Sequence, residues 1–156
     1  MPIRNPSGPT EVIVHIDGAS RGNPGPAAYA VVIETGDRAL VTSFSKVLGQ
    51  TTNNVAEYRA LMAALDYALS HHHLRLKVLS DSELLVRQIS GRYKVKSRGL
   101  KPLHEQARQM ITQLEAFSIE HVPRERNRQA DRLANQALDA AEKHSITART
   151  QRHQER

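Results

Sequence analysis

The first third of the chain alternates between apolar and polar positions, the pattern of strands with one buried face. Strands are predicted over residues 11–18, 26–35 and 39–48. The connections between them are short and carry Gly-Pro and Gly36-Asp37, dipeptides typical of turns. The three strands are therefore expected to form an antiparallel meander.

From Asn53 to Leu69 the apolar residues change to helical spacing, with Tyr58, Leu61 and Leu65 on one stripe. Further on, strands are predicted at 74–79 and 117–122, and helices at 82–89, from Pro102 to about Leu114, and at 127–141. Alternating strands and helices after a meander predict an α/β fold. We expect a five-stranded mixed sheet flanked by helices, with parallel pairing in its second half.

The 156 residues fit one domain, predicted to cover residues 11–141. Residues 1–10 are expected to form a flexible N-terminal segment, and residues 142–156 a flexible basic tail. Both lack a regular apolar pattern. No internal repeat or linker interrupts the chain between them.

Composition narrows the possible functions. The absence of cysteine excludes disulfides, a thiolate nucleophile and a thiolate zinc site. No apolar run reaches the ~20 residues that span a bilayer, and the N-terminus lacks the core of a signal peptide, so a cytoplasmic soluble protein is expected. The net charge of +6 indicates a polyanionic partner such as nucleic acid.

Four carboxylates stand where strands end or helices begin. Asp17 ends the first strand, Asp81 follows the fourth, Glu57 is expected in the first turn of its helix, and Asp131 in that of the last helix. These positions meet at one edge of an α/β sheet. Clustered carboxylates repel one another unless cations neutralise them, and oxygen ligands favour Mg²⁺ or Mn²⁺. Two such ions can activate water for phosphoryl displacement.

Each helical carboxylate also has a purely structural interpretation. Asn54 and Glu57 could form a capping box, Asp81 could cap the helix that follows it, and Asp131 could complement a helix dipole. Asp17 is different, because a strand offers an aspartate no cap, and an unpaired buried carboxylate is costly.

These residues carry a family resemblance. The segments are 17–26 (DGASRGNPGP), 51–54 (TTNN) leading into Ala56-Glu57, 80–82 (SDS), and Asn127 followed by 131–134 (DRLA). In this order they resemble type 1 ribonuclease H, over almost the whole chain from about residue 11 to 141. The resemblance implies a ribonuclease-H-like fold and an enzyme that cuts the RNA strand of an RNA/DNA hybrid, leaving 5′-phosphate and 3′-hydroxyl ends. It also implies two Mg²⁺ ions, with Mn²⁺ as a substitute, held by Asp17, Glu57, Asp81 and Asp131.

Several other residues are candidates for substrate contact. Gly18 lets a backbone approach closely, Glu57 can accept a hydrogen bond from a 2′-hydroxyl, and four side chains offer short polar contacts. Those four are Asn23, Thr52, Asn53 and Asn54, which are equally suited to turns and caps.

The loop before Asp131 departs from the family pattern, because it lacks the histidine found there in many members. This short-loop form resembles archaeal and some bacterial enzymes. His121 is predicted to lie inside the fifth strand in a structural role, so Arg124 or Arg126 is a candidate for product or phosphate contact.

A run of basic residues between two predicted helices includes Arg92, Lys94 and Lys96, with Tyr93 among them. Such a run fits contact with a DNA backbone, although charged loops are also common on any surface.

Other functions remain open at this point. A hybrid-binding module without turnover would need only the basic surface, and a related nuclease acting on DNA or a domain detached from a reverse transcriptase would share the fold. The complete acidic set favours the enzyme, which is expected to act as a monomer.

Overall fold

The computed structural model describes residues 11–37 and 39–154, and side chains as far as residue 144. The predicted flexible segment 1–10 lies outside the described residues. The strands are β1 (Val12–Ser20), β2 (Gly25–Thr35), β3 (Leu40–Thr51), β4 (Arg75–Ser80) and β5 (Ala116–His121). The helices are α1 (Asn53–Ser70), α2 (Glu83–Ile89), α3 (Lys101–Ile111) and α4 (Arg128–Gln154), with a 3₁₀ turn η1 at Arg124–Arg126.

The strands form one mixed sheet in the order β3-β2-β1-β4-β5. β2 pairs antiparallel with both β1 and β3, whereas β4 pairs parallel with both β1 and β5. This confirms the predicted meander and the parallel second half. β1 lies at the centre, so its C-terminal end is surrounded by neighbouring elements.

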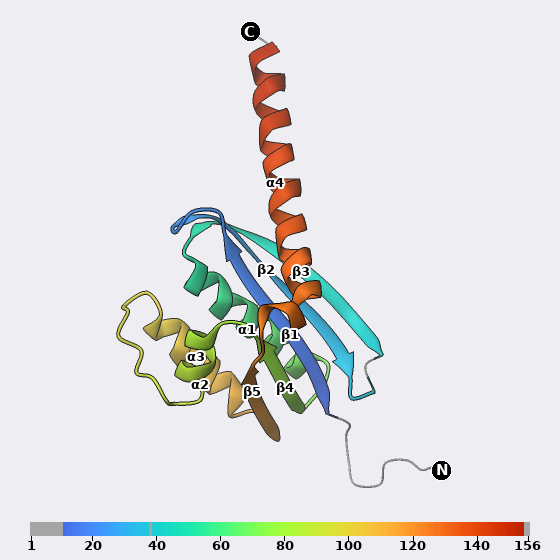
Figure 1. Ribbon diagram of the computed structural model, residues 1–156, viewed down its shortest axis with the longest axis vertical. Helices are drawn as coiled ribbons and strands as arrows, with labels where there is room; N and C mark the ends of the chain where they lie inside the picture. Colours follow the sequence, from blue (N-terminus) through green and yellow to red (C-terminus); the bar gives the residue numbers. More distant parts are fainter. Residues whose placement is uncertain (1–10, 38, 155–156) are drawn as a thin grey trace.

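The main core lies between the sheet and α1. Val12, Val14 and Ile16 of β1 are buried on the same face, against Leu61 and Leu65 of α1. Fully burying each such side chain contributes about 1.5–3 kcal/mol. α2 and α3 flank α1, and α4 crosses the opposite face of the sheet over β1, β2 and β3 (Figure 1). Each face of the sheet therefore carries a helix that contacts β1, α1 on one face and α4 on the other.

The last helix is longer than the pattern predicted. α4 continues to Gln154 and projects beyond the sheet, whereas its end was expected near Ala141 (Figure 1). The apolar stripe marks only the part that packs on the sheet, and the remainder contains neither glycine nor proline to end the helix. Among the described residues, no helix is both long and apolar enough to cross a membrane.

Candidate active site

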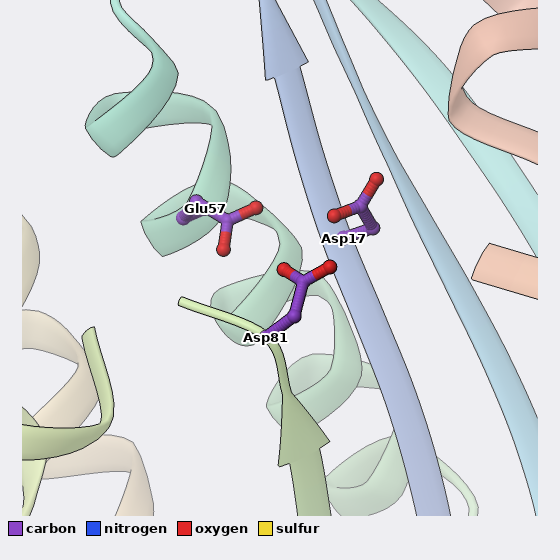
Figure 2. A group of neighbouring side chains, drawn as sticks. All are labelled: Asp17, Glu57 and Asp81. Carbon is purple, nitrogen blue, oxygen red and sulfur yellow. The ribbon is translucent and has the colours of Figure 1, made fainter. Parts of the chain in front are cut away.

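Three carboxylates from three different elements surround one small space. Asp17 lies on β1, Glu57 on α1, and Asp81 directly after β4 (Figure 2). One oxygen of each lies within 4.8 Å of the others. Asp17 and Glu57 are only 4% and 2% exposed, so water screens their charges poorly.

Gly18 explains how a carboxylate on α1 reaches the end of β1. A Cβ atom on Gly18 would overlap with the backbone of Ala56 and Glu57, so only glycine allows this close approach. The Gly18 amide donates a hydrogen bond to Glu57 Oε1. The glycine thus serves helix packing, a reason that the sequence alone did not reveal.

The observed caps remove the structural interpretations of Glu57 and Asp81. Thr52 caps α1 by accepting from the Val55 amide at 3.2 Å, so the proposed capping box of Asn54 and Glu57 is wrong. Glu57 was expected in the first turn of α1, but it lies just beyond that turn, where no cap needs it.

The second cap is equally clear. Ser82, and not Asp81, caps α2 by accepting from the Leu85 amide at 3.2 Å. Neither Glu57 nor Asp81 therefore acts as an N-cap, and both carboxylates are left for another task.

Asp131 stands slightly apart from the buried group. It lies in the first turn of α4, as predicted, where it also suits the helix dipole. Its side chain is 31% exposed, and Arg124 Nη2 lies 3.5 Å from its Oδ1. Asp131 is nevertheless close enough to Asp17 for its charge and a hydrogen bond to act on that carboxyl.

Burial and mutual repulsion raise the pKa values of the cluster. Burial, followed by the charges of Asp81 and Asp131, raises the pKa of Asp17 to about 8. Burial and the charge of Asp17 hold the pKa of Glu57 well above its ordinary value. Burial also raises the pKa of Asp81, although Asn127 and Arg124 oppose the shift. At neutral pH the cluster therefore favours binding of protons or of another cation.

The donor set fits a divalent ion. Glu57 Oε2 is buried and has no hydrogen-bond partner among the described residues, which leaves an unpaired buried acceptor on a member of the acidic group. Carboxylate oxygens are hard ligands that suit Mg²⁺, Mn²⁺ or Ca²⁺. The acidic group can therefore hold a divalent metal.

The carboxylates line a cleft of about 400 Å³. Of the other predicted residues, Gly18, Asn53 and Arg124 line it as well. Asn23 lies next to it, because Asn23 Oδ1 accepts a hydrogen bond from the Asn53 amide at 3.0 Å. Asn54 is exposed on the first turn of α1.

The remaining basic candidates lie outside this cleft. Lys94 lines a separate groove between the 91–100 loop and α3, and Arg126 lines a hollow beside His15 and Glu34. Arg92 and Lys96 are not among the residues that line either hollow, and their substrate role stays a prediction.

Two asparagines near the acidic group were not among the predicted site residues. Asn127 is 1% exposed, and its Nδ2 donates to the carbonyl of Ile16 at 2.8 Å, which ties α4 to β1 beside Asp17. Asn135 lines the cleft one turn after Asp131. Asn127 belongs to the segment that carried the resemblance, whereas no sequence signal marked Asn135.

His121 lies at the end of β5, so its predicted place in the strand is confirmed. It pairs with Ser80 in the parallel ladder. The imidazole is exposed, and its charge, when present, lowers the pKa of Asp81.

Comparisons with known proteins agree with this fold. Residues 15–137 match the family described as Reverse transcriptase-like. The bifunctional protein Rv2228c of Mycobacterium tuberculosis is 50% identical over 132 residues, which are 84% of this chain. The chain spans only 36% of the length of that relative.

Solved structures give fuller coverage. The N-terminal RNase H domain of the same mycobacterial protein superposes with a TM-score of 0.83 at 46% identity, covering 88% of this chain and 99% of that domain. RNase H1 of Halobacterium salinarum gives 0.81 at 42% identity, covering 83% and 98%. LC11-RNase H1, isolated from compost and solved with an RNA/DNA hybrid, gives 0.78 at 41% identity, also covering 83% and 98%. With its sheet order and its acidic cluster, this chain belongs to the ribonuclease H family.

Proposed function

We propose that this protein is a metal-dependent endoribonuclease that hydrolyses the RNA strand of RNA/DNA hybrids and leaves 5′-phosphate and 3′-hydroxyl ends. The observation that carries the proposal is the convergence of Asp17, Glu57 and Asp81 within 4.8 Å, with Asp131 beside them. The hybrid bound to LC11-RNase H1 supports the choice of substrate.

The four carboxylates are the residues that would hold two Mg²⁺ ions, or Mn²⁺ in their place. Bound ions of this kind activate an attacking water and stabilise the departing 3′ oxygen. Asp17 is central to the group, because the charges of both Asp81 and Asp131 act on it. Glu57 is buried, so water screens its charge poorly.

The residues around the acidic group suit the sugar-phosphate backbone of the RNA strand. Gly18 and Asn53 line the cleft, and Asn23, Thr52 and Asn54 lie at or beside the start of α1. Glu57 is placed to accept a hydrogen bond from a 2′-hydroxyl, the group that distinguishes RNA from DNA.

Arg124 is placed to bind a phosphate at the edge of the cleft. Its side chain is 78% exposed, and it contacts Asp131 only at 3.5 Å, so its guanidinium can turn toward an incoming phosphate. Arg126 is a second candidate of the same kind, although it lines a different hollow.

The exposed 91–100 loop suits the DNA strand. Arg92, Lys94 and Lys96 would contact phosphates without reading bases. Tyr93 is 47% exposed, and the Arg87 guanidinium carbon lies 5.3 Å from the centre of its ring. Such contacts give affinity that does not depend on sequence.

The test is cleavage of a hybrid labelled on either strand, beside matched double-stranded RNA and DNA, with Mg²⁺, Mn²⁺ or a chelator. We expect cleavage of the RNA strand of the hybrid alone, lost with the chelator and in Asp17→Asn. Tight hybrid binding without cleavage under either metal would instead identify a binding module. Sedimentation of the same sample would test the proposed monomer.

A further inference from the structure

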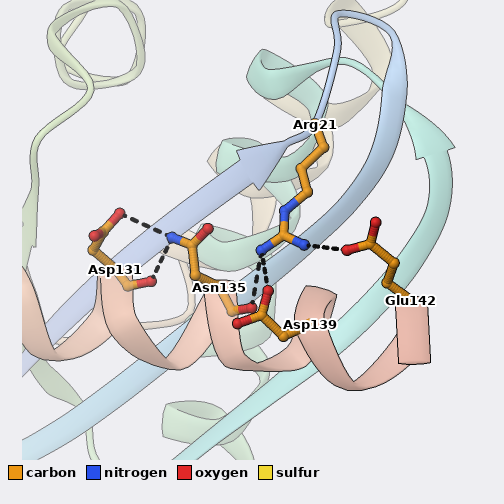
Figure 3. A network of polar contacts seen from close by, with 5 residues as sticks. All are labelled: Arg21, Asp131, Asn135, Asp139 and Glu142. Carbon is orange, nitrogen blue, oxygen red and sulfur yellow. Dashed lines mark hydrogen bonds and ion pairs between the residues drawn. The ribbon is translucent and has the colours of Figure 1, made fainter. Parts of the chain in front are cut away.

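Arg21 joins the turn after β1 to α4. Its Nη2 donates to Asp139 Oδ1 at 2.6 Å and to the backbone carbonyl of Asn135 at 3.3 Å, and its Nη1 donates to Glu142 Oε2 at 3.0 Å (Figure 3). One guanidinium thus contacts three groups along one face of the helix. This planar set of donors fixes orientation as well as distance.

Asn135 continues the connection toward the acidic group. Its Nδ2 lies 3.0 Å from the carbonyl of Asp131 and 3.4 Å from Asp131 Oδ1 (Figure 3). The residues Asp131, Asn135 and Asp139 are spaced four apart, so they lie on one face of α4. A side chain on the β1–β2 turn is therefore linked to the one carboxylate outside the buried group.

The turn that holds Arg21 is itself well anchored. The Arg21 amide donates to the Pro26 carbonyl at 2.8 Å, and a Cβ atom on Gly25 would overlap with the Arg21 carbonyl. On its other side, Asn23 accepts from the amide of Asn53 at the start of α1. The turn therefore contacts both helices that carry carboxylates of the site, α1 with Glu57 and α4 with Asp131.

These contacts are poorly suited to provide stability. The side chains of Arg21, Asp139 and Glu142 are 36%, 62% and 64% exposed, and ion pairs at such positions contribute only about 0–1 kcal/mol. Ala130, Ala134 and Leu138 are buried and hold α4 on the sheet by apolar contact. What the polar contacts add is the orientation of α4 over residues 135–142, directly after the turn that carries Asp131.

We propose that Arg21 is a positioning residue that acts through Asn135 to hold Asp131 in place for divalent metal binding. This inference rests on the proposed function, because it assigns Arg21 to the same metal site. It applies to the metal-binding step and requires no contact between Arg21 and the substrate.

The sign of the effect separates positioning from simple electrostatics. If only Coulomb interactions matter, removing the positive charge of Arg21 should strengthen cation binding, because the arginine repels the cation. Loss of positioning predicts the opposite. We expect Arg21→Gln to weaken Mn²⁺ binding about tenfold. Losses of metal affinity of this size follow when groups that orient metal ligands are removed.

The experiment measures Mn²⁺ binding by calorimetry on the full chain without nucleic acid, together with thermal unfolding. Arg21→Gln and Asn135→Ala should each weaken binding, and the double variant should be no weaker than either, because both remove one connection. Lys77→Gln is the matched control, since Lys77 has the same 36% exposure and pairs with Glu120 at 3.1 Å elsewhere on the sheet.

Three results would overturn the inference. They are unchanged or tighter Mn²⁺ binding in Arg21→Gln, effects of the two variants that multiply, and weaker binding that follows only from a lower unfolding temperature. If the wild-type protein neither binds Mn²⁺ nor cleaves hybrid, the proposed function fails as well. Wild-type binding and cleavage with an unaffected Arg21→Gln would refute the positioning role alone.

Discussion

The buried carboxylates favour metal binding but are expected to destabilise the metal-free fold. Asp17 is almost inaccessible to water, and its pKa is raised to about 8 by burial and by the charges of Asp81 and Asp131. A metal-free protein at higher pH must therefore keep several repelling charges in a poorly solvated space. The same arrangement favours a cation, so the groups that bind metal are expected to weaken the fold in its absence.

Replacing the central carboxylate should expose this conflict. We expect Asp17→Asn to abolish hybrid cleavage and to raise the stability of the metal-free protein above pH 8. The full shift of the Asp17 pKa, from 3.8 to about 8, would correspond to ~1.4 kcal/mol for each pKa unit. The expected gain is smaller than that total, on the order of 2 kcal/mol, because neighbouring carboxyls also take up protons. Urea unfolding in a chelator measures it. A less stable variant would contradict the proposed repulsion.

The pH dependence should carry the same signature. Because the pKa of Asp17 is raised from 3.8 to about 8 on folding, the folded state binds more protons between these values. Its contribution to stability is full below pH 4 and is lost as pH rises through about 8. The stability difference between wild type and Asp17→Asn should therefore grow over this range. A difference that is constant with pH would show that Asp17 titrates normally.

Excess Mg²⁺ provides the control for that measurement. A bound cation should supply the neutralising charge that protons provide in its absence, so the difference curve should flatten. This comparison separates the acidic group from the other carboxyls of the chain.

At the level of elements, the close contact between β1 and α1 sets the position of Glu57. We expect Gly18→Ala to lower the free energy of unfolding by about 2–3 kcal/mol, because the new methyl group would overlap with the backbone of α1. Cleavage should fall about a hundredfold as Glu57 moves away from the other carboxylates.

Gly99→Ala is the matched control for this change, since the nearest atom to its Cβ would be Ser97 Oγ at 3.8 Å. Chemical denaturation measures both variants, and initial cleavage rates compare Gly18→Ala with the wild-type protein, because Gly99 lies in the 91–100 loop proposed to contact the DNA strand. Equal stability of the two alanine variants, with wild-type cleavage by Gly18→Ala, would mean that the helix adjusts without affecting the site.

Much of the arrangement of helices and strands could be predicted from the sequence. Alternation along β1 and helical spacing along α1 are local signals, and the order of elements then implies the mixed sheet. Asp17 was recognisable because a strand end offers an aspartate no cap. The end of α4 could not be predicted from the apolar stripe, which reports packing on the sheet and not the helix itself.

Long-range contacts explain what sequence reasoning did not find. The tie from Asn127 to Ile16, the connection from Arg21 to Asn135, and the close approach at Gly18 each join residues far apart in the chain. A residue's own neighbourhood in sequence carries no record of such a partner. The cap of α1 was misassigned for a different, local reason, because Thr52 and Asn54 are both common cap residues and stand only two positions apart.

For the whole molecule, the net charge of +6 should govern how strongly a hybrid binds. We expect the double variant Lys94→Ala/Lys96→Ala to lower the slope of log affinity against log salt by about 1–2, because each phosphate contact contributes roughly 0.9. Hybrid binding in Ca²⁺ over a salt series measures the slope. Lys77→Ala should leave it unchanged, and an equal slope in all three proteins would exclude the 91–100 loop as a contact surface.

The acidic group is complete only when distant parts of the chain have come together. Asp17, Glu57, Asp81 and Asp131 come from β1, α1, the end of β4 and α4, which are spread over most of the chain. Partly folded states that lack parallel pairing or the docking of α4 would contain at most a fraction of the acidic group. Recovery of cleavage during refolding should therefore follow the slowest long-range step, and an enzymatic signal would report completion of the whole architecture.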